Sequence, residues 1–312
     1  MAAMPSHPLH APVLAWYAVH ARDLPWRDPA CSPWGVLVSE VMLQQTPVVR
    51  VLPAWRAWME RWPGPAALAA DPPGEAVRMW GRLGYPRRAL RLHRCAEVVT
   101  AEHGGVLPAD HDVLLTLPGV GTYTAAAVAS FAFGARHAVV DTNVRRVLAR
   151  AVTGTAFPAP ALTAAESRLA ASLVPDEPAV AARWAVAAME LGALVCTARA
   201  PRCGDCPVAR SCRWQADGAP AHAGPPRRGQ TYAGNDRWVR GLLIAALRDA
   251  DGPVPLATLV AAAPDAALAD PRQRDRCLDG LVADGLVEPL DGDRFRLPGT
   301  APGTVSRPRR TG

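Results

Sequence analysis

The stretch LPGVGTYTAAAVASFAFGARHAVVDTNV, residues 117–144, contains the features that point most directly to one helical fold. A tight glycine turn, Gly119-Val120-Gly121, leads straight into an alanine-rich segment of helical character. The backbone N–H groups and the positive helix end at such a turn can hold one phosphate without reading a base sequence. Because many helical turns contain two glycines, this motif alone identifies no partner.

Asp141, near the end of the same stretch, opens a second helical segment, TNVRRVLAR. An aspartate at that place commonly caps the helix, which is a purely structural role. The N-terminus of a helix also favours the charged carboxylate, so capping is compatible with a catalytic role.

A second carboxylate, Glu40, stands among apolar residues in GVLVSEVMLQQT, residues 35–46. Burial would raise its pKa and keep it protonated near neutral pH, but the solvent face of an amphipathic helix is an equally open alternative. Together with Asp141 it would supply one neutral acid and one charged carboxylate. That division suits cleavage of a glycosidic bond, in which one group donates a proton and the other stabilises an oxocarbenium-like sugar.

The composition limits the chemistry further. The 312 residues have a net charge of +6 and a pI of about 9.2, which favours a polyanionic partner. All 34 basic residues are arginine, so no side-chain amine is present to form a Schiff base, and a P-loop lysine is missing. No apolar run suits a membrane span and no secretory signal is recognisable, so we expect a cytoplasmic protein.

The chain is long enough for two or three domains. Helical periodicity predicts one mainly α domain over residues 1–216, and the Gly-, Pro- and Ala-rich residues 217–234 resemble a linker. Residues 235–300 show three helical segments and then a hairpin around Asp-Gly-Asp, which is typical of a small winged-helix-like α+β domain. Residues 301–312 are expected to be a basic, disordered tail.

Four of the seven cysteines lie close together with the spacing C-x6-C-x2-C-x5-C: Cys196, Cys203, Cys206 and Cys212. Disulfides are disfavoured in a cytoplasmic chain, so a metal site is the natural interpretation. Zinc sites usually have two close ligand pairs and this segment has one, so the spacing favours a [4Fe–4S] cluster and leaves zinc open. Interleaved arginines favour a structural loop that faces DNA.

Taken together, these motifs resemble the helix-hairpin-helix DNA glycosylases, and among them the MutY-type adenine glycosylases. The resemblance covers residues 15–215 and rests, in order, on RDLPWR, SEVMLQQT, LPGVGTYTA, VVDTNVRRVLAR, MELGALVCT and the cysteine spacing. It implies a mainly α, two-lobed helix-hairpin-helix domain with an iron–sulfur loop and a [4Fe–4S] cluster rather than zinc. It also implies a monomer that acts at the nucleoid on double-stranded DNA containing adenine mispairs, without a membrane.

The resemblance further implies roles for individual residues. Glu40 is expected to protonate the flipped adenine, and Asp141 to stabilise the sugar cation with Asn143 beside it. The expected adenine-binding residues are Arg22, Trp26, Arg27, Leu43, Tyr123 and Glu190. Gln45, with Gln44 beside it, matches the residue wedged into the base stack after flipping, and Gly119 and Gly121 match the phosphate-gripping hairpin.

Tyr123 stands where the related endonuclease III-like enzymes have a lysine that attacks the sugar. With tyrosine there and no lysine in the chain, we expect hydrolysis by water without strand cleavage. The expected function is therefore a monofunctional glycosylase that removes adenine mispaired with 8-oxoguanine or guanine during base excision repair. Two alternatives are a glycosylase for thymine or uracil opposite guanine and a non-catalytic cluster protein that only binds DNA.

The chain departs from the family pattern in two places. Thr142 stands where the family often has glycine. Residues 231–312 are too short for the usual Nudix-like domain that recognises 8-oxoguanine, and a winged helix is predicted instead. Several arginines there either contact DNA or form a solvated basic face: Arg272, Arg274, Arg276, Arg294 and Arg296.

Overall fold

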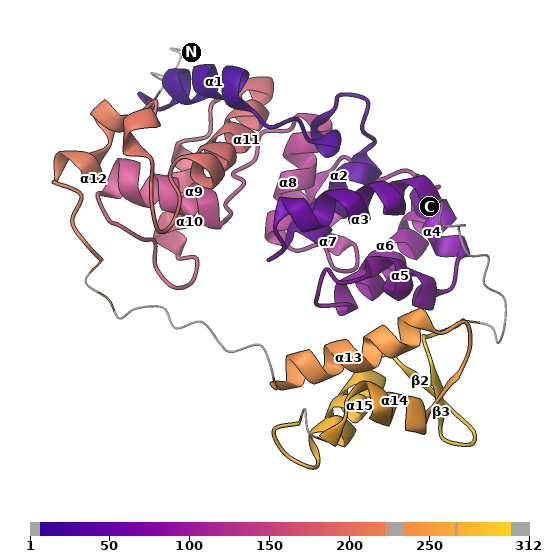
Figure 1. The fold of residues 1–312 in the computed structure, drawn as a ribbon. Coiled ribbons are helices and arrows are strands. Elements are labelled where there is room, and N and C mark those ends of the chain that lie inside the picture. Colours follow the sequence, from indigo (N-terminus) through magenta and orange to yellow (C-terminus); the bar gives the residue numbers. More distant parts are fainter. Residues whose placement is uncertain (1–6, 223, 225–233, 266–267, 301–312) are drawn as a thin grey trace. The chain divides into compact units, whose positions relative to one another are not determined.

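The computed structural model describes residues 7–222, 224, 234–265 and 268–300 (Figure 1). It is mainly helical, with one small sheet near the C-terminus, which confirms the predicted fold class. Most of the predicted linker and the whole predicted tail, residues 301–312, lie outside the described residues. Within the described ranges, no helix combines the length and the apolarity that crossing a membrane requires.

Two compact units make up the chain, and neither is continuous in sequence. The first contains Met1–Glu40, Pro108–Thr116 and Val120–Pro226, and the second contains the segments between and after them. The helices of the first unit are α1 (His10–His20), α7 (His111–Thr116), α8 (Thr122–Phe133), α9 (Thr142–Leu148), α10 (Ala164–Ser172), α11 (Pro178–Leu194) and α12 (Arg213–Ala216). Its short helical turns are η1 (Pro25–Arg27), η2 (Ala149–Thr153), η3 (Cys203–Asp205) and η4 (Ala209–Ser211). Helix α2 (Pro33–Leu43) begins in the first unit and ends in the second.

Helix α11 forms the centre of the first unit and packs against α1, α8 and α9. Its buried face is rich in alanine, so neighbouring backbones approach closely, and Leu191 and Trp184 fill the core beside it. The helix begins after Glu177, whose side chain accepts the N–H groups of Ala179 and Val180. Helix α11 is therefore firmly packed and holds the side chains that project from it in fixed positions.

The second unit contains a helical part with a tryptophan core. Helices α3 (Val48–Arg61), α4 (Pro65–Ala70) and α5 (Pro73–Trp80) precede the long α6 (Arg87–Glu102), which packs on α4 and α5. Trp58 meets Trp62 and Trp80 edge to face, with ring centres 4.6 and 5.7 Å apart, and all three are fully buried. This core holds the start of α6 in place.

The C-terminal part of the second unit has winged-helix topology. Its helices are α13 (Asp236–Asp249), α14 (Leu256–Ala262) and α15 (Gln273–Ala283), and its antiparallel strands are β1 (Val254–Pro255), β2 (Glu288–Leu290) and β3 (Arg294–Arg296), in the order β1-β3-β2. The sequence predicted the hairpin of β2 and β3 but not β1, because two residues that include a proline give no strand signal.

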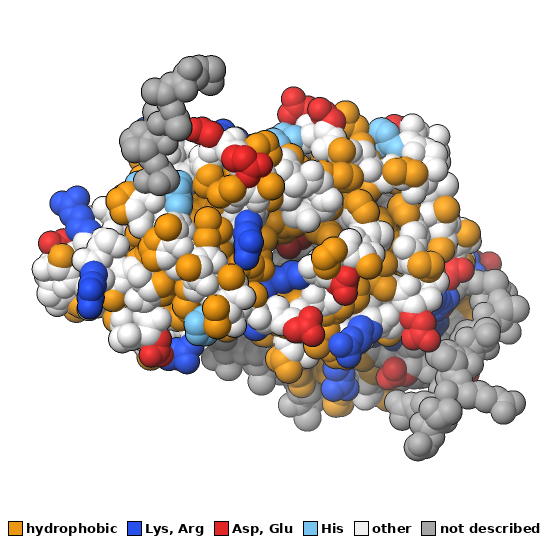
Figure 2. Space-filling view, turned by 90° about the horizontal axis from the view of Figure 1, so that it is seen from above, with side chains coloured by type: hydrophobic (Ala, Val, Ile, Leu, Met, Phe, Trp, Pro, Cys, Tyr) orange, Lys and Arg blue, Asp and Glu red, His pale blue; other side chains and the backbone are white. Residues whose placement is uncertain are grey.

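The arginines of this C-terminal part are largely engaged with neighbouring acids. Arg274 pairs with Asp265, Arg276 with Asp236 and Asp270, and Arg296 with Glu288. On the face drawn in Figure 2, arginine side chains are likewise interspersed with acidic and apolar ones. In this C-terminal part, the charges of these three arginines are therefore largely balanced by the acids that they contact.

Candidate active site

Glu40 is buried in the first unit, on α2, with 6% of its surface exposed. The hydroxyl of Tyr123, at the start of α8, donates to its Oε2 at 2.9 Å. Burial raises the pKa of Glu40 to about 7; the Tyr123 hydrogen bond opposes this rise and the nearby charge of Asp141 adds to it. The solvent-face alternative for Glu40 is thus not what the structure shows, and the side chain is a proton donor near neutral pH.

Asp141 caps α9 as the sequence predicted. Its Oδ1 accepts the N–H of Val144 and its Oδ2 accepts the amide of Asn143, both at 2.7 Å. Burial nevertheless raises the pKa of Asp141 above its ordinary value, although these two hydrogen bonds oppose the rise. The sequence analysis expected the N-terminus of α9 to favour the charged form of Asp141. It did not include the desolvation of the buried carboxylate, which is the larger effect.

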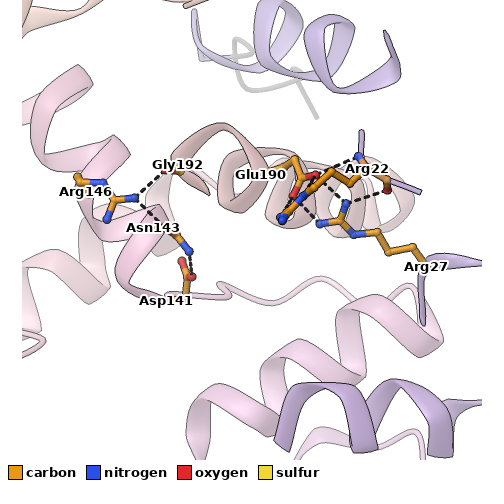
Figure 3. A network of polar contacts seen from close by, with 7 residues as sticks. All are labelled: Arg22, Arg27, Asp141, Asn143, Arg146, Glu190 and Gly192. Atoms are coloured by element: carbon orange, nitrogen blue, oxygen red, sulfur yellow. Dashed lines mark hydrogen bonds and ion pairs between the residues drawn. The ribbon is translucent and has the colours of Figure 1, made fainter. Parts of the chain in front are cut away.

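Asn143 connects Asp141 to the end of α11 through Arg146, a residue that the sequence analysis missed (Figure 3). The guanidinium of Arg146 donates to Asn143 Oδ1 and to Gly192 O, each at 2.7 Å, and to Cys196 O at 2.6 Å. Asn143 is thereby fixed on both sides of its amide. The feature of the sequence that could have indicated this contact is the position of Arg146 one helical turn after Asn143.

Glu190 lies at the centre of an ion cluster at the other end of the view in Figure 3. Its carboxylate is fully buried and accepts four hydrogen bonds from the side chains of Arg22 and Arg27, at 2.7–3.0 Å, and one from Arg22 N at 3.0 Å. Burial alone would raise the pKa of Glu190, but these donors outweigh it and lower the pKa to about 2. Arg22, Arg27 and Glu190, three of the six residues predicted to bind adenine, thus bind one another.

The remaining predicted residues occupy separate places. Trp26 is buried in the turn η1, and Leu43 ends α2. Gln44 and Gln45 form the turn after α2, where Gln45 is exposed. This turn belongs to the second unit, as does Leu43.

The glycine hairpin has the backbone that its sequence predicted. Gly119 has a φ of +80°, which glycine adopts without strain, and Gly121 immediately precedes α8. No side chain caps the first N–H groups of α8, and a Cβ added to Gly121 would meet nothing within 4 Å. The exposed N–H groups at this helix N-terminus can donate hydrogen bonds to a bound anion.

The four clustered cysteines line one small cavity together with Arg150 and Gln215. Arg150 donates to Cys196 Sγ at 3.3 Å, and Gln215 donates to Cys203 Sγ at 3.1 Å. Among the described residues, no three thiol, imidazole or carboxylate groups are placed to hold a single metal ion. Four cysteine thiols around one cavity are a donor set that iron–sulfur clusters use.

This site contains a buried carboxylic acid whose pKa is near neutral pH and an aspartate that caps a helix. It also contains a helix N-terminus whose N–H groups can bind a phosphate. Residues 38–171 match the family model of the HhH-GPD superfamily base excision DNA repair protein. The fold and the site therefore define the class of helix-hairpin-helix DNA glycosylases. The chain is 55% identical to the adenine DNA glycosylase of Mycolicibacterium smegmatis over 95% of this chain and 97% of that protein. It belongs to the adenine DNA glycosylase family.

One further relative carries the same family name, and one solved structure shares the glycosylase fold. The adenine DNA glycosylase of Mycobacterium tuberculosis is 53% identical over 95% of both chains. A solved structure of a thermostable thymine-DNA glycosylase superposes with a TM-score of 0.58 at 29% identity, covering 66% of this chain and 94% of the other. Because the mycobacterial matches span 296 residues, they extend into the C-terminal winged-helix part.

Proposed function

We propose that the protein is a monofunctional DNA glycosylase that removes adenine mispaired with 8-oxoguanine or guanine in duplex DNA. The observation that supports this most is the buried Glu40, held by Tyr123 with a pKa raised to about 7 in the electrostatic range of Asp141. The adenine DNA glycosylases 53–55% identical to this chain support adenine as the base. The arrangement provides a proton for the leaving base and a carboxylate for the sugar.

In the proposed reaction, adenine is extruded from the duplex and Glu40 transfers its carboxyl proton to a ring nitrogen of the base. The C1′–N9 bond then breaks, and its electron pair leaves with adenine. Asp141 stabilises the resulting oxocarbenium-like sugar, and water adds to C1′ while its proton passes to Glu40. The products are free adenine and an intact strand with an abasic site.

Asn143 and the glycine hairpin have supporting roles in this proposal. Asn143 orients Asp141 through its 2.7 Å hydrogen bond and is itself fixed by Arg146. The N–H groups at the start of α8 and around Gly119 and Gly121 would hold one phosphate of the strand. Arg22, Arg27 and Glu190 would form one wall of the adenine pocket as a preformed ion cluster.

We also infer that Cys196, Cys203, Cys206 and Cys212 hold a [4Fe–4S] cluster. Their shared cavity and the donors that Arg150 and Gln215 direct at two sulfurs support this, as such hydrogen bonds stabilise cluster thiolates. Bound there, the cluster would cross-link the loop structurally. Zinc would need all four sulfurs about 2.3 Å from one ion.

The test replaces each acid with its amide. Under single-turnover conditions, Glu40→Gln and Asp141→Asn are each expected to reduce adenine release at least about 1,000-fold while duplex binding stays within about threefold. Glu60→Gln, at an exposed site on α3, is the matched control and should keep the wild-type rate. Full activity in either acid variant would remove that residue from the mechanism.

A panel of mispaired duplexes distinguishes the alternatives. Release of thymine or uracil opposite guanine in place of adenine would support the first alternative; the solved structure 29% identical to this chain is a thymine-DNA glycosylase. No free base from any duplex would leave a protein that only binds DNA.

A further inference from the structure

The turn that follows α2 has a strained residue at its exposed tip. Gln45 has a φ of +55°, a left-handed conformation that is strained for a residue other than glycine. Its side chain is exposed, whereas Thr46 directly after it is buried. A backbone conformation of this kind persists only where surrounding groups fix it, and such positions concentrate at ligand clamps.

Arg88, at the start of α6, supplies the groups that fix this turn. Its side chain is only 7% exposed. One terminal nitrogen donates to Val41 O at 2.8 Å and to Gln44 O at 2.6 Å. The other donates to Gly84 O at 3.0 Å, so a single guanidinium connects the end of α2, the turn and the segment before α6.

Thr46 completes the contact on the other side of the turn. Arg88 donates to its hydroxyl at 3.3 Å, and that hydroxyl lies 3.2 Å from both Gln44 O and Leu83 O. The backbone N–H of Thr46 also donates to Leu43 O at 3.2 Å. The residues on both sides of Gln45 are therefore held by hydrogen bonds.

The charge of Arg88 is directed at backbone rather than at an acid. Within the described ranges it forms no ion pair with a carboxylate. Its guanidinium faces the carboxyl end of α2, where the helix dipole favours a cation, and the rings of Trp80 and Tyr85 lie 5.2 and 5.6 Å away. An apolar side chain would fill this space without the free-energy cost of burying a charge. Packing therefore does not explain the arginine, and its hydrogen bonds to the turn are the feature to be explained.

We propose that Arg88 is a positioning residue for base extrusion: it holds the turn so that the Gln45 side chain projects into the base stack. This inference rests on the proposed function and on the expectation from the resemblance that Gln45 is wedged into the base stack after flipping. A side chain that enters the base stack must keep its position against the stacked bases, and a flexible turn would let it move away. Arg88 supplies the stiffness without touching the substrate.

The activity test uses Arg88→Lys, which keeps the charge but replaces the planar fork with one nitrogen. The single-turnover rate of this variant on adenine opposite 8-oxoguanine is expected to fall about 10–100-fold, but only about threefold or less on adenine opposite an abasic site, where unpairing costs less. Arg94→Lys, on the same helix with a side chain 68% exposed, should match wild type on both duplexes. An equal loss on both duplexes, or no loss on either, would overturn the proposal.

A second measurement needs no enzyme activity. In the DNA-free protein, amide hydrogen exchange at residues 44–46 is expected to be at least about tenfold faster in Arg88→Lys, with the rest of α6 unchanged. Thr46→Val, which removes only the hydroxyl, should change exchange in the same direction by less. If wild type released no adenine, the proposed function would fail while this readout still tested Arg88; unchanged exchange in both variants would refute its role.

Discussion

At the residue scale, Glu40 and Asp141 differ chiefly in how many donors hold their carboxylates. Asp141 accepts two hydrogen bonds at 2.7 Å, and Glu40 accepts one at 2.9 Å from Tyr123. Burial disfavours the charged form of both, and the hydrogen-bond donors oppose it together with the charges of Arg27 near Glu40 and Arg146 near Asp141. Glu40, with fewer donors, is therefore the acid that keeps its proton.

This difference predicts the pH dependence of base release. Because the pKa of Glu40 is raised to about 7, the proton donor is present below that pH, and the rate should fall about tenfold per unit above it. Tyr123→Phe removes the hydrogen bond that lowers this pKa, so the descending limb should move to higher pH. Single-turnover rates measured from about pH 5 to about pH 9 check both; a flat profile would argue against Glu40 as the donor.

Glu190 behaves in the opposite way and predicts a stability effect. Its pKa is lowered from 4.5 to about 2, so its contribution is fully present above about pH 4.5 and is lost as the pH falls towards 2. Glu190→Gln should lower the free energy of unfolding by about 2–4 kcal/mol at neutral pH, because Arg27, whose side chain is only 18% exposed, loses its charged partner. Urea unfolding at pH 7 and about pH 3 should show the difference shrinking in acid, and a constant difference would contradict it.

At the element scale, α9 and α11 approach closely enough for Arg146 on α9 to donate both to Asn143 Oδ1 on its own helix and to Gly192 O on α11. The approach depends on Gly192, because a Cβ there would lie 2.7 Å from the Cβ of Asn143. Gly192 O also accepts a hydrogen bond from Arg146. The glycine therefore sets the distance between α11 and the end of α9 that carries Asp141 and Asn143.

Gly192→Ala should displace Asn143 and with it Asp141. We expect a loss of about 1–3 kcal/mol in unfolding free energy and a fall in single-turnover rate of at least about tenfold. Gly64→Ala, where an added Cβ meets nothing within 4 Å, is the matched control. Wild-type rates for Gly192→Ala would show that α9 tolerates the shift.

The sequence predicted the elements of this site better than the contacts between them. Glu40, Asp141 and the glycine hairpin lie in local motifs whose residue types imply their environment. Arg88 and Arg146 were missed because both bind backbone carbonyls that are distant in sequence, and for Arg146 the one local signal was its position one turn after Asn143. Strand β1 was missed because it exists only through pairing with β3.

At the scale of the whole molecule, the absence of lysine restricts the reaction. A glycosylase that also cuts the strand commonly does so through an imine between a side-chain amine and the sugar. Arginine is protonated at every working pH and cannot take that role. The composition and Tyr123 therefore both favour water as the nucleophile.

The strand should accordingly stay intact after base release. On a denaturing gel, a single turnover with adenine opposite 8-oxoguanine should give a cut strand only after alkali is added. Cleavage without alkali, at the rate of base release, would contradict hydrolysis by water alone.

The contact of α1 with α11 has a consequence for how the protein is made. Arg22 meets Glu190 across 168 positions, so most of the polypeptide must leave the ribosome before these partners can join. Contacts this distant fold late, and the emerging N-terminal segment must wait with its apolar side chains uncovered. The first unit is thus expected to fold only after its last segment, which ends at Pro226, has been made, while the C-terminal part is still being synthesised.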